Sequence, residues 1–122
     1  MTESEFIAMT DRVLEQVGEA LDDSDSDVDW QLNDGVLEID CSDAVADSVG
    51  GGSGGKIILN RHLPNRELWL ATKGGGYHFR NVDGRWVDTR GKNDLGAELA
   101  GALATQAGMT TPPAFLFLRE TD

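Results

Sequence analysis

Residues 56–88 read KIILNRHLPNRELWLATKGGGYHFRNVDGRWVD, and this stretch decides the fold class. Apolar and polar residues alternate along much of it, which is the period of a half-buried β-strand. Short turns interrupt the alternation at Pro64-Asn65, Lys73-Gly74-Gly75 and Asp83-Gly84. Strands joined by turns this short form an antiparallel meander. The expected strands are 56–60, 67–72, 76–80 and 85–88.

Two more strands are expected before the meander. Residues 28–32 alternate between apolar and polar, and Asn33-Asp34-Gly35 is a strong hairpin signal. The second strand covers residues 36–41 and places Leu37, Ile39 and Cys41 on one side. The segment 47–55, DSVGGGSGG, predicts a flexible loop.

Amphipathic helices are expected on either side of the strands. Residues 3–22 place apolar side chains at spacings of three and four, and Thr2 with Glu5 matches a capping box. A second helix is expected over 93–106, with Gly108 as its stop. The apolar tail 112–119 is expected to pack on the core. The sequence therefore predicts one domain, 1–122, an α+β two-layer sandwich with both helices on one face of an antiparallel sheet.

The charge of the chain is large and uneven. Residues 1–55 contain 15 acids and one base, Arg12, whereas residues 56–122 contain seven acids and nine bases. Nucleic acid is an unfavourable ligand, because its phosphates must be met by Lys and Arg. The acidic half is suited to metal cations or to a basic protein surface. The alternative is that the net charge of −12 only keeps the protein in solution.

Carboxylates recur at i, i+4 spacing on the side of the first helix opposite its apolar stripe: Asp11, Glu15, Glu19 and Asp23, with Asp22 beside them. Like charges at this spacing cost roughly 0.2–0.5 kcal/mol per pair. The run continues after the helix with Asp25, Asp27 and Asp29. A merely solvated face usually interleaves Lys or Arg, so the stripe favours a binding surface.

Exposed carboxylates of this kind allow two uses. Hard cations take oxygen ligands, and a row of carboxylates along a helix and turn cannot enclose an ion. Weak, partly hydrated binding of several ions is therefore expected. The same row could pair with an arginine patch on another protein. Both uses need the same charges, and the residues alone leave both open.

Three other patterns lack the spacing that their chemistry requires. Residues 50–56 resemble a phosphate-binding loop, but Ile57 follows where Ser or Thr is needed and opens a strand. Residues 25–29 resemble the start of an EF-hand loop, but the required Gly and Glu are missing further on. An enzyme is the weaker class, because no spacing supports a nucleophile and base among Cys41, His62 and His78.

Trp69 is a candidate anchor on the other side of the sheet. Alternation puts Leu68 and Leu70 on one face and Trp69 on the other. If the leucines face the helices, the indole lies on the open face, where Trp commonly anchors protein interfaces. The alternative is a local aromatic cluster on the outer face.

The chain resembles a known family in its motifs. GKIILNR at 55–61, Pro64 and LWLA at 68–71 look like the central signature of the frataxins, and GGYHF at 75–79 and Trp86 continue it. SEF at 4–6 and LDD at 21–23 resemble the bacterial branch. His62 stands where the family usually has Gln.

The resemblance implies a non-enzymatic regulator or adaptor of iron–sulfur cluster assembly. It would hold ferrous and ferric iron weakly and bind a cysteine desulfurase and its scaffold protein. The carboxylates implied to face iron and the desulfurase are Glu15, Glu19, Asp22, Asp23 and Asp25. Asp29 continues the run as a further candidate ligand, and Asn60 and Trp69 would face partners on the sheet. The alternatives are an acidic adaptor without a physiological role for iron, and an enzyme that oxidises ferrous iron.

Location and assembly follow from other features. The first five residues carry acid where a targeting peptide would carry base. Cys41 is the only cysteine, and no run approaches the ~20 apolar residues of a membrane helix. A cytoplasmic protein without membrane contact is expected. It is expected to be a monomer, with iron-dependent oligomers as a further expectation.

Overall fold

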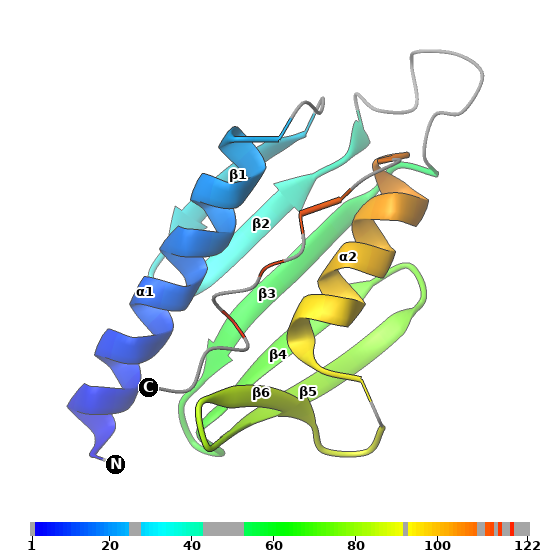
Figure 1. Ribbon diagram of the computed structural model, residues 1–122. Helices are drawn as coiled ribbons and strands as arrows, with labels where there is room; N and C mark the ends of the chain where they lie inside the picture. Colours follow the sequence, from blue (N-terminus) through cyan, green and yellow to red (C-terminus); the bar gives the residue numbers. More distant parts are fainter. Residues whose placement is uncertain are drawn as a thin grey trace.

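The computed structural model describes residues 2–24, 28–42, 53–91 and 93–109, together with 112, 113, 115 and 118. Its elements follow the chain in this order: α1 (Glu3–Asp22), β1 (Asp29–Asn33), β2 (Val36–Asp40), β3 (Lys56–His62), β4 (Glu67–Thr72), β5 (Gly75–Val82), β6 (Arg85–Asp88) and α2 (Leu95–Gln106). The strands form one antiparallel sheet in the order β1-β2-β3-β4-β5-β6 (Figure 1). The expected meander is thus confirmed.

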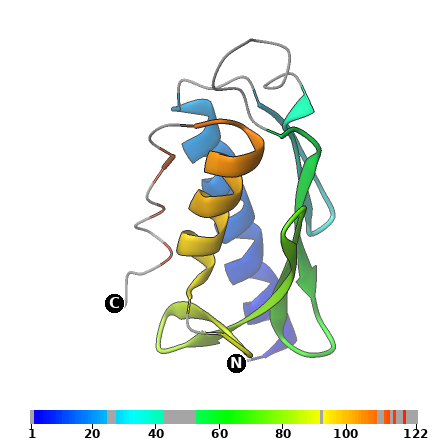
Figure 2. The ribbon, with the colours of Figure 1, turned by 90° about the vertical axis from the view of Figure 1, so that its right-hand side faces the viewer.

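Both helices lie on one face of the sheet and leave the other face uncovered, as the side view in Figure 2 shows. The core lies between these two layers. Each strand contributes alternate residues to it, and the fully buried ones are Leu37, Ile39, Ile57, Leu59, Leu68, Leu70 and Phe79. The predicted α+β sandwich is therefore confirmed, and its open face carries the residues between these leucines and isoleucines.

Two hairpin turns form as their sequences predict. Asp34 and Gly35 have φ of 47° and 80°, and Asp83 and Gly84 have φ of 52° and 85°. A two-residue hairpin loop of type I′ needs positive φ at both positions, which Asp-Gly adopts at low cost. These turns fix the register of β1 against β2 and of β5 against β6.

Helix α1 begins and ends as expected. Thr2 and Glu5 form the predicted capping box, with each side chain accepting the other residue's backbone N–H. The buried stripe is wider than the apolar pattern indicated, because Thr10 and Gly18 are buried beside it. Thr10 is accommodated because its hydroxyl donates to the Phe6 carbonyl at 2.8 Å.

Some boundaries differ from the expected ones. β3 continues to His62 and β5 to Val82, because their partners β4 and β6 extend the ladder over these residues. α2 begins at Leu95 rather than at residue 93, because the Asp94 side chain caps it by accepting the Ala97 N–H.

Two expectations lie partly outside the described residues. Of the apolar tail, Phe115 and Leu118 are described and only 2% exposed, so both pack on the core as predicted. Residues 43–52, which include most of the glycine-rich loop, are not described. At its end, Ser53 and Gly54 donate backbone N–H groups to Thr105 and Gln106 of α2.

Candidate functional site

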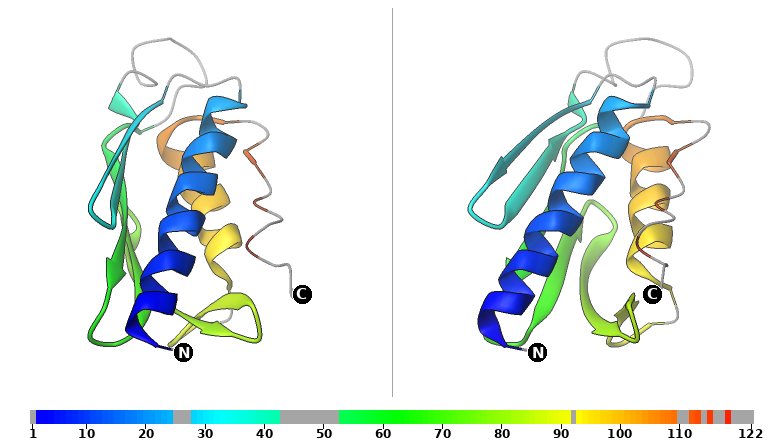
Figure 3. Two further views of the ribbon diagram at one scale, coloured as in Figure 1. Left: turned by 90° about the vertical axis from the view of Figure 1, so that its left-hand side faces the viewer. Right: turned by 60° about the vertical axis from the view of Figure 1, so that its left-hand side comes forward.

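The acidic ridge consists of the exposed carboxylates Glu15, Glu19, Asp22 and Asp23 at α1 and Asp29 at the start of β1. The C-terminal end of α1 lies beside β1 in the views of Figure 3. No base lies in the last turn of α1. Asp25, also predicted to belong here, lies outside the described residues. The ridge is thus an exposed surface that runs from α1 to the start of β1, where Trp30 contacts Asp22.

The ridge does not form a metal cage. Within residues 2–24, 28–42 and the other described segments, no three His, Cys, Asp or Glu side chains are grouped so that they could hold an ion. Exposed carboxylates along a helix can still hold hydrated hard cations through one oxygen each. The residues therefore fit weak iron binding and do not fit an enclosed iron site.

Asp22 is held in place by an indole from β1. Trp30 Nε1 donates to Asp22 Oδ1 at 2.9 Å. The Trp30 ring lies directly on Gly18, one turn earlier in α1, where an added Cβ would come within 2.6 Å of the ring. Glycine at position 18 therefore lets the indole reach the ridge. One oxygen of Asp22 is committed to this bond, and the other remains for a ligand.

Asp11 has a cationic partner that the helix pattern alone does not reveal. Arg61 Nη1 at the end of β3 lies 2.6 Å from Asp11 Oδ1 and 3.4 Å from Thr10 Oγ1. The Arg61 side chain is only 13% exposed. Its guanidinium packs against Gly35, where φ is 80° and an added Cβ would lie 2.8 Å from Nη2. Asp11 therefore belongs to a contact between α1 and the sheet, and not to the unpaired ridge.

Trp69 lies on the open face, as the burial of Leu68 and Leu70 requires. It is not a free anchor, however. The indole is stacked between His62, at 3.7 Å between ring centroids, and His78, at 4.1 Å, with all three rings nearly parallel. The alternative of an outer aromatic cluster is the arrangement found. The cross-strand register explains it, because Trp69 pairs with His78 and His62 lies on the adjoining strand.

Asn60 shares this face with the stack. It is paired across the sheet with Trp69 on one side and with Val36 on the other. Val36 is 42% exposed, which is high for an apolar side chain. The two residues predicted to face partners, Asn60 and Trp69, are thus neighbours on one partly apolar surface.

Glu67 anchors the stack from within the sheet. Its side chain is 6% exposed, accepts the Trp69 Nε1–H at 2.7 Å, and pairs with Arg80 at 3.2 Å. Burial alone would raise the pKa of Glu67, but the hydrogen bonds from Trp69 and Arg80 and the charge of Arg80 outweigh it and lower the pKa below 4.5. Its ionised form is thus the one that the fold stabilises.

Acid should therefore destabilise the protein through Glu67. A carboxyl whose pKa is lowered by folding contributes stability above its ordinary pKa, and this contribution is lost as the pH falls through the lowered value. We expect the free energy of unfolding of Glu67→Gln to decrease less than that of the wild type as the pH is lowered from about 5. Urea unfolding at a series of pH values measures this. Glu15→Gln, which removes an exposed carboxylate, is the control and should follow the wild type. If the free energy of unfolding of Glu67→Gln falls with pH as steeply as that of the wild type, the role assigned to Glu67 is refuted.

Cys41 lies away from both histidines. It is fully buried on the helix-facing side of the sheet, whereas His62 and His78 lie on the open side. Burial, together with the charge of Asp40, raises the pKa of the Cys41 thiol to about 11. The structure therefore gives no support to a nucleophile and base built from these residues.

The Cys41 thiol should react slowly in the folded protein. At pH 8 a thiol of pKa about 11 is roughly 0.1% thiolate, against roughly 25% for an ordinary cysteine. Ellman's reagent is expected to modify the folded protein at least about 100-fold more slowly than the chain in urea. Comparable rates in the two states would show that Cys41 is accessible and ionisable.

None of the helices in the described part of the chain is both long and apolar enough to cross a bilayer. Fold and surfaces together define a two-layer α+β protein whose charged helix and open sheet face are its candidate binding surfaces.

Known proteins are similar to this chain in sequence. A family model described as a frataxin-like domain matches residues 1–109. The iron-sulfur cluster assembly protein CyaY of Cupriavidus metallidurans is 40% identical over 90% of this chain and 94% of that protein. The protein of the same name from Neisseria meningitidis serogroup C is 39% identical over 88% and 92%. The chain therefore belongs to the frataxin-like family.

Solved structures agree with this assignment. A frataxin from Psychromonas ingrahamii superposes with a TM-score of 0.76 at 29% identity, covering 91% of this chain and 96% of that one. Yeast frataxin gives a TM-score of 0.52 at 23% identity over 83% of this chain and 79% of its own, which shows the shared fold alone. The resemblance noted in the motifs, including that to the bacterial branch, is confirmed.

Proposed function

We propose that this protein takes part in iron–sulfur cluster assembly as an iron-binding regulator or adaptor without catalytic turnover. Bacterial relatives that match this chain over nearly their whole length are named iron-sulfur cluster assembly proteins. The observation that carries the proposal within this chain is the ridge of exposed carboxylates without a base in the last turn of α1. Such a surface attracts a basic partner and hydrated cations alike.

The partners we propose are the cysteine desulfurase and the scaffold protein of the assembly machinery. The ridge would dock on basic residues of the desulfurase, since complementary charges accelerate encounter and fix orientation. The surface formed by Asn60, Trp69 and Val36 would meet the scaffold, because a half-buried indole beside exposed apolar area suits a protein interface. A cytoplasmic location follows from these partners.

Ferrous or ferric iron would bind at the ridge through single carboxylate oxygens of Glu15, Glu19, Asp22, Asp23 and Asp29, with water completing its shell. Fully exposed carboxylates keep their hydration, so each ion is held weakly. The second candidate function, an acidic adaptor without iron, is supported by the lack of a three-ligand group among the described residues.

Calorimetric titration of the cysteine desulfurase from the same genome, under anaerobic conditions, tests the proposal. We expect salt-sensitive binding whose affinity changes when ferrous iron is added. Binding that is indifferent to iron and survives chelation would favour the adaptor. The absence of binding in both conditions would refute docking on the desulfurase. Oxygen consumption above the rate of iron alone would instead indicate an iron-oxidising enzyme.

A further inference from the structure

Strand β5 is longer than the strand beside it. β4 pairs with β5 from Gly75 to Arg80, whereas β6 pairs with it only from Phe79 to Val82. One more bond follows, from the Thr89 N–H to the His78 carbonyl at 2.9 Å. Beyond it the chain turns toward α2, as Asp88 N–H donates to the Asn93 carbonyl. The described strands therefore leave the β6 side of Gly75–Tyr77 without a partner.

The backbone groups on this side can be assigned from the ladder. In a strand the N–H and C=O of one residue point to the same side, and those two residues away point there as well. His78 turns its carbonyl toward Thr89 and hence its N–H also. Gly76 therefore presents both an N–H and a C=O at the uncovered edge, in the spacing that an added strand uses.

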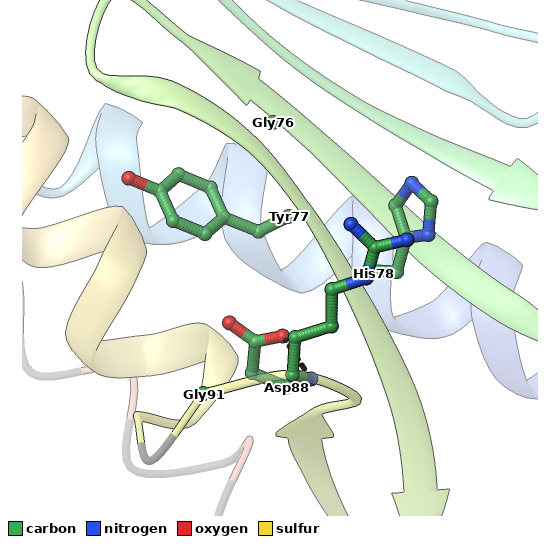
Figure 4. Close-up of a pocket in the computed structure, with 6 residues that line it drawn as sticks. Gly76, Tyr77, His78, Asp88 and Gly91 are labelled. Atoms are coloured by element: carbon green, nitrogen blue, oxygen red, sulfur yellow. Dashed lines mark hydrogen bonds between the residues drawn. The ribbon is translucent and has the colours of Figure 1, made fainter.

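A cavity of about 250 Å³ lies along this edge. It is lined by Gly76, Tyr77 and His78 of β5 and by Asp88, Arg90 and Gly91 of the segment after β6. In Figure 4 the Tyr77 and His78 side chains point to opposite sides of β5, and Gly76, which precedes them, has no side chain. The cavity is smaller than the roughly 300–1,000 Å³ of small-molecule sites, so it suits a short piece of backbone better than a cofactor.

The uncovered edge at Gly75–Tyr77 is short, but it carries no proline and no charged residue. Proteins protect free edges with Pro, Lys or other charged residues. Here the three residues Gly74, Gly75 and Gly76 precede Tyr77, and a Cβ at Gly76 would meet nothing within 4 Å. Glycine within a strand often marks a close approach by another backbone. The opposite edge differs, because β1 begins with the exposed Asp29, a member of the acidic ridge.

The cavity is lined by one cation, Arg90, and one carboxylate, Asp88. The Arg90 guanidinium has no ion pair within the described part of the chain, so it is available to an acidic side chain. One oxygen of the Asp88 carboxylate, Oδ1, already accepts a hydrogen bond from the Arg90 backbone N–H at 2.9 Å. His78 adds a second group that can donate a hydrogen bond.

We infer that the uncovered edge of β5 at Gly76 binds an extended peptide segment of a partner protein by strand addition, with an acidic side chain of that segment on Arg90. Main-chain hydrogen bonds to the N–H and C=O of Gly76 hold the segment, and Arg90 selects the charge. This inference concerns a surface separate from the acidic ridge and does not depend on iron.

Two blocked peptides, acetyl-TVEVT-amide and acetyl-TVKVT-amide, test the inference by ¹⁵N NMR titration of the full chain. The glutamate peptide is expected to shift the amide signals of Gly76 and His78 in a saturable way. Gly76→Pro removes the outward N–H and should abolish these shifts, whereas Gly76→Ala keeps the N–H and should bind as the wild type does. Proline is tolerated on an edge strand whose N–H is unpaired.

The charge variants decide the selectivity and remain informative if Gly76→Pro does not fold. Arg90→Glu should weaken the glutamate peptide about fivefold, and Arg12→Glu, an equal charge change on α1, should not. Absence of saturable shifts, or unchanged binding to folded Gly76→Pro, would overturn strand addition. Equal affinity for the lysine peptide, or equal effects of the two arginine variants, would overturn the role of Arg90.

Discussion

Replacing Glu19, Asp22 and Asp23 together by lysine is expected to abolish binding to the cysteine desulfurase. Each reversal removes an attraction to a basic partner and adds a repulsion. At about 1 kcal/mol for each residue, the three changes together weaken binding at least about 100-fold. Calorimetry or surface plasmon resonance at physiological salt measures the loss. Undiminished affinity in the triple variant would refute docking through the ridge.

The fold should survive this change. Loss of the hydrogen bond from Trp30 to Asp22 costs about 1 kcal/mol. Relief of like-charge contacts and the placement of lysines at the helix C-terminus return a similar amount. The matched control replaces three acids outside the ridge by lysine, Glu3, Asp83 and Glu98, and adds the same charge. We expect the ridge variant to unfold within about 1 kcal/mol of the wild type and to lose binding. The control should be less stable, because Asp83 has a φ of 52° and Glu98 accepts a hydrogen bond from Asn93, but it should keep its binding.

Arg61→Ala is expected to lower the free energy of unfolding by about 2 kcal/mol. The guanidinium joins α1 to the end of β3 through Asp11 and Thr10, and its side chain is mostly buried. Removal therefore loses charged hydrogen bonds and the packing of the aliphatic stem against Gly35. Urea unfolding measures the change, and Arg61→Lys should recover only part of it, since lysine lacks the planar fork.

The control for this variant is Asp34→Asn. Asp34 also approaches Arg61, but at 4.0 Å and fully exposed, so its charge should contribute less than about 0.5 kcal/mol. Asparagine tolerates the positive φ at this position, which isolates the charge. An Arg61→Ala variant as stable as Asp34→Asn would show that the contact between α1 and the sheet is unimportant for stability.

Local signals predicted most of the fold. The capping box at Thr2, the Asp-Gly turns at 34–35 and 83–84, and the alternation around Leu68 and Leu70 each depend on residues near one another in sequence. The element ends were less predictable, because β3 and β5 extend as far as their neighbours allow. The acidic ridge was also predictable, since three of its members share one helix and Asp23 is its C-cap.

The contacts across the sheet were the part that sequence reasoning missed. Arg61 reaches Asp11 across 50 positions, so the helix pattern alone counted Asp11 as unpaired. The His62–Trp69–His78 stack did have a signal. A hairpin that turns between Thr72 and Gly75 places Trp69 opposite His78, and the preceding turn places Asn60 opposite Trp69, with His62 two residues beyond. The contacts of Glu67 with Trp69 and Arg80 beside the stack could not be inferred without that register.

The rate of iron–sulfur cluster formation directly tests the proposed role in cluster assembly. Cluster formation on the scaffold protein would be followed by absorbance with the desulfurase, cysteine and ferrous iron, with and without one equivalent of this protein. We expect the wild-type protein to change the rate, and the triple lysine variant at Glu19, Asp22 and Asp23 to leave it unchanged. The same rate with wild-type protein, with the variant and with neither would contradict a role in cluster assembly.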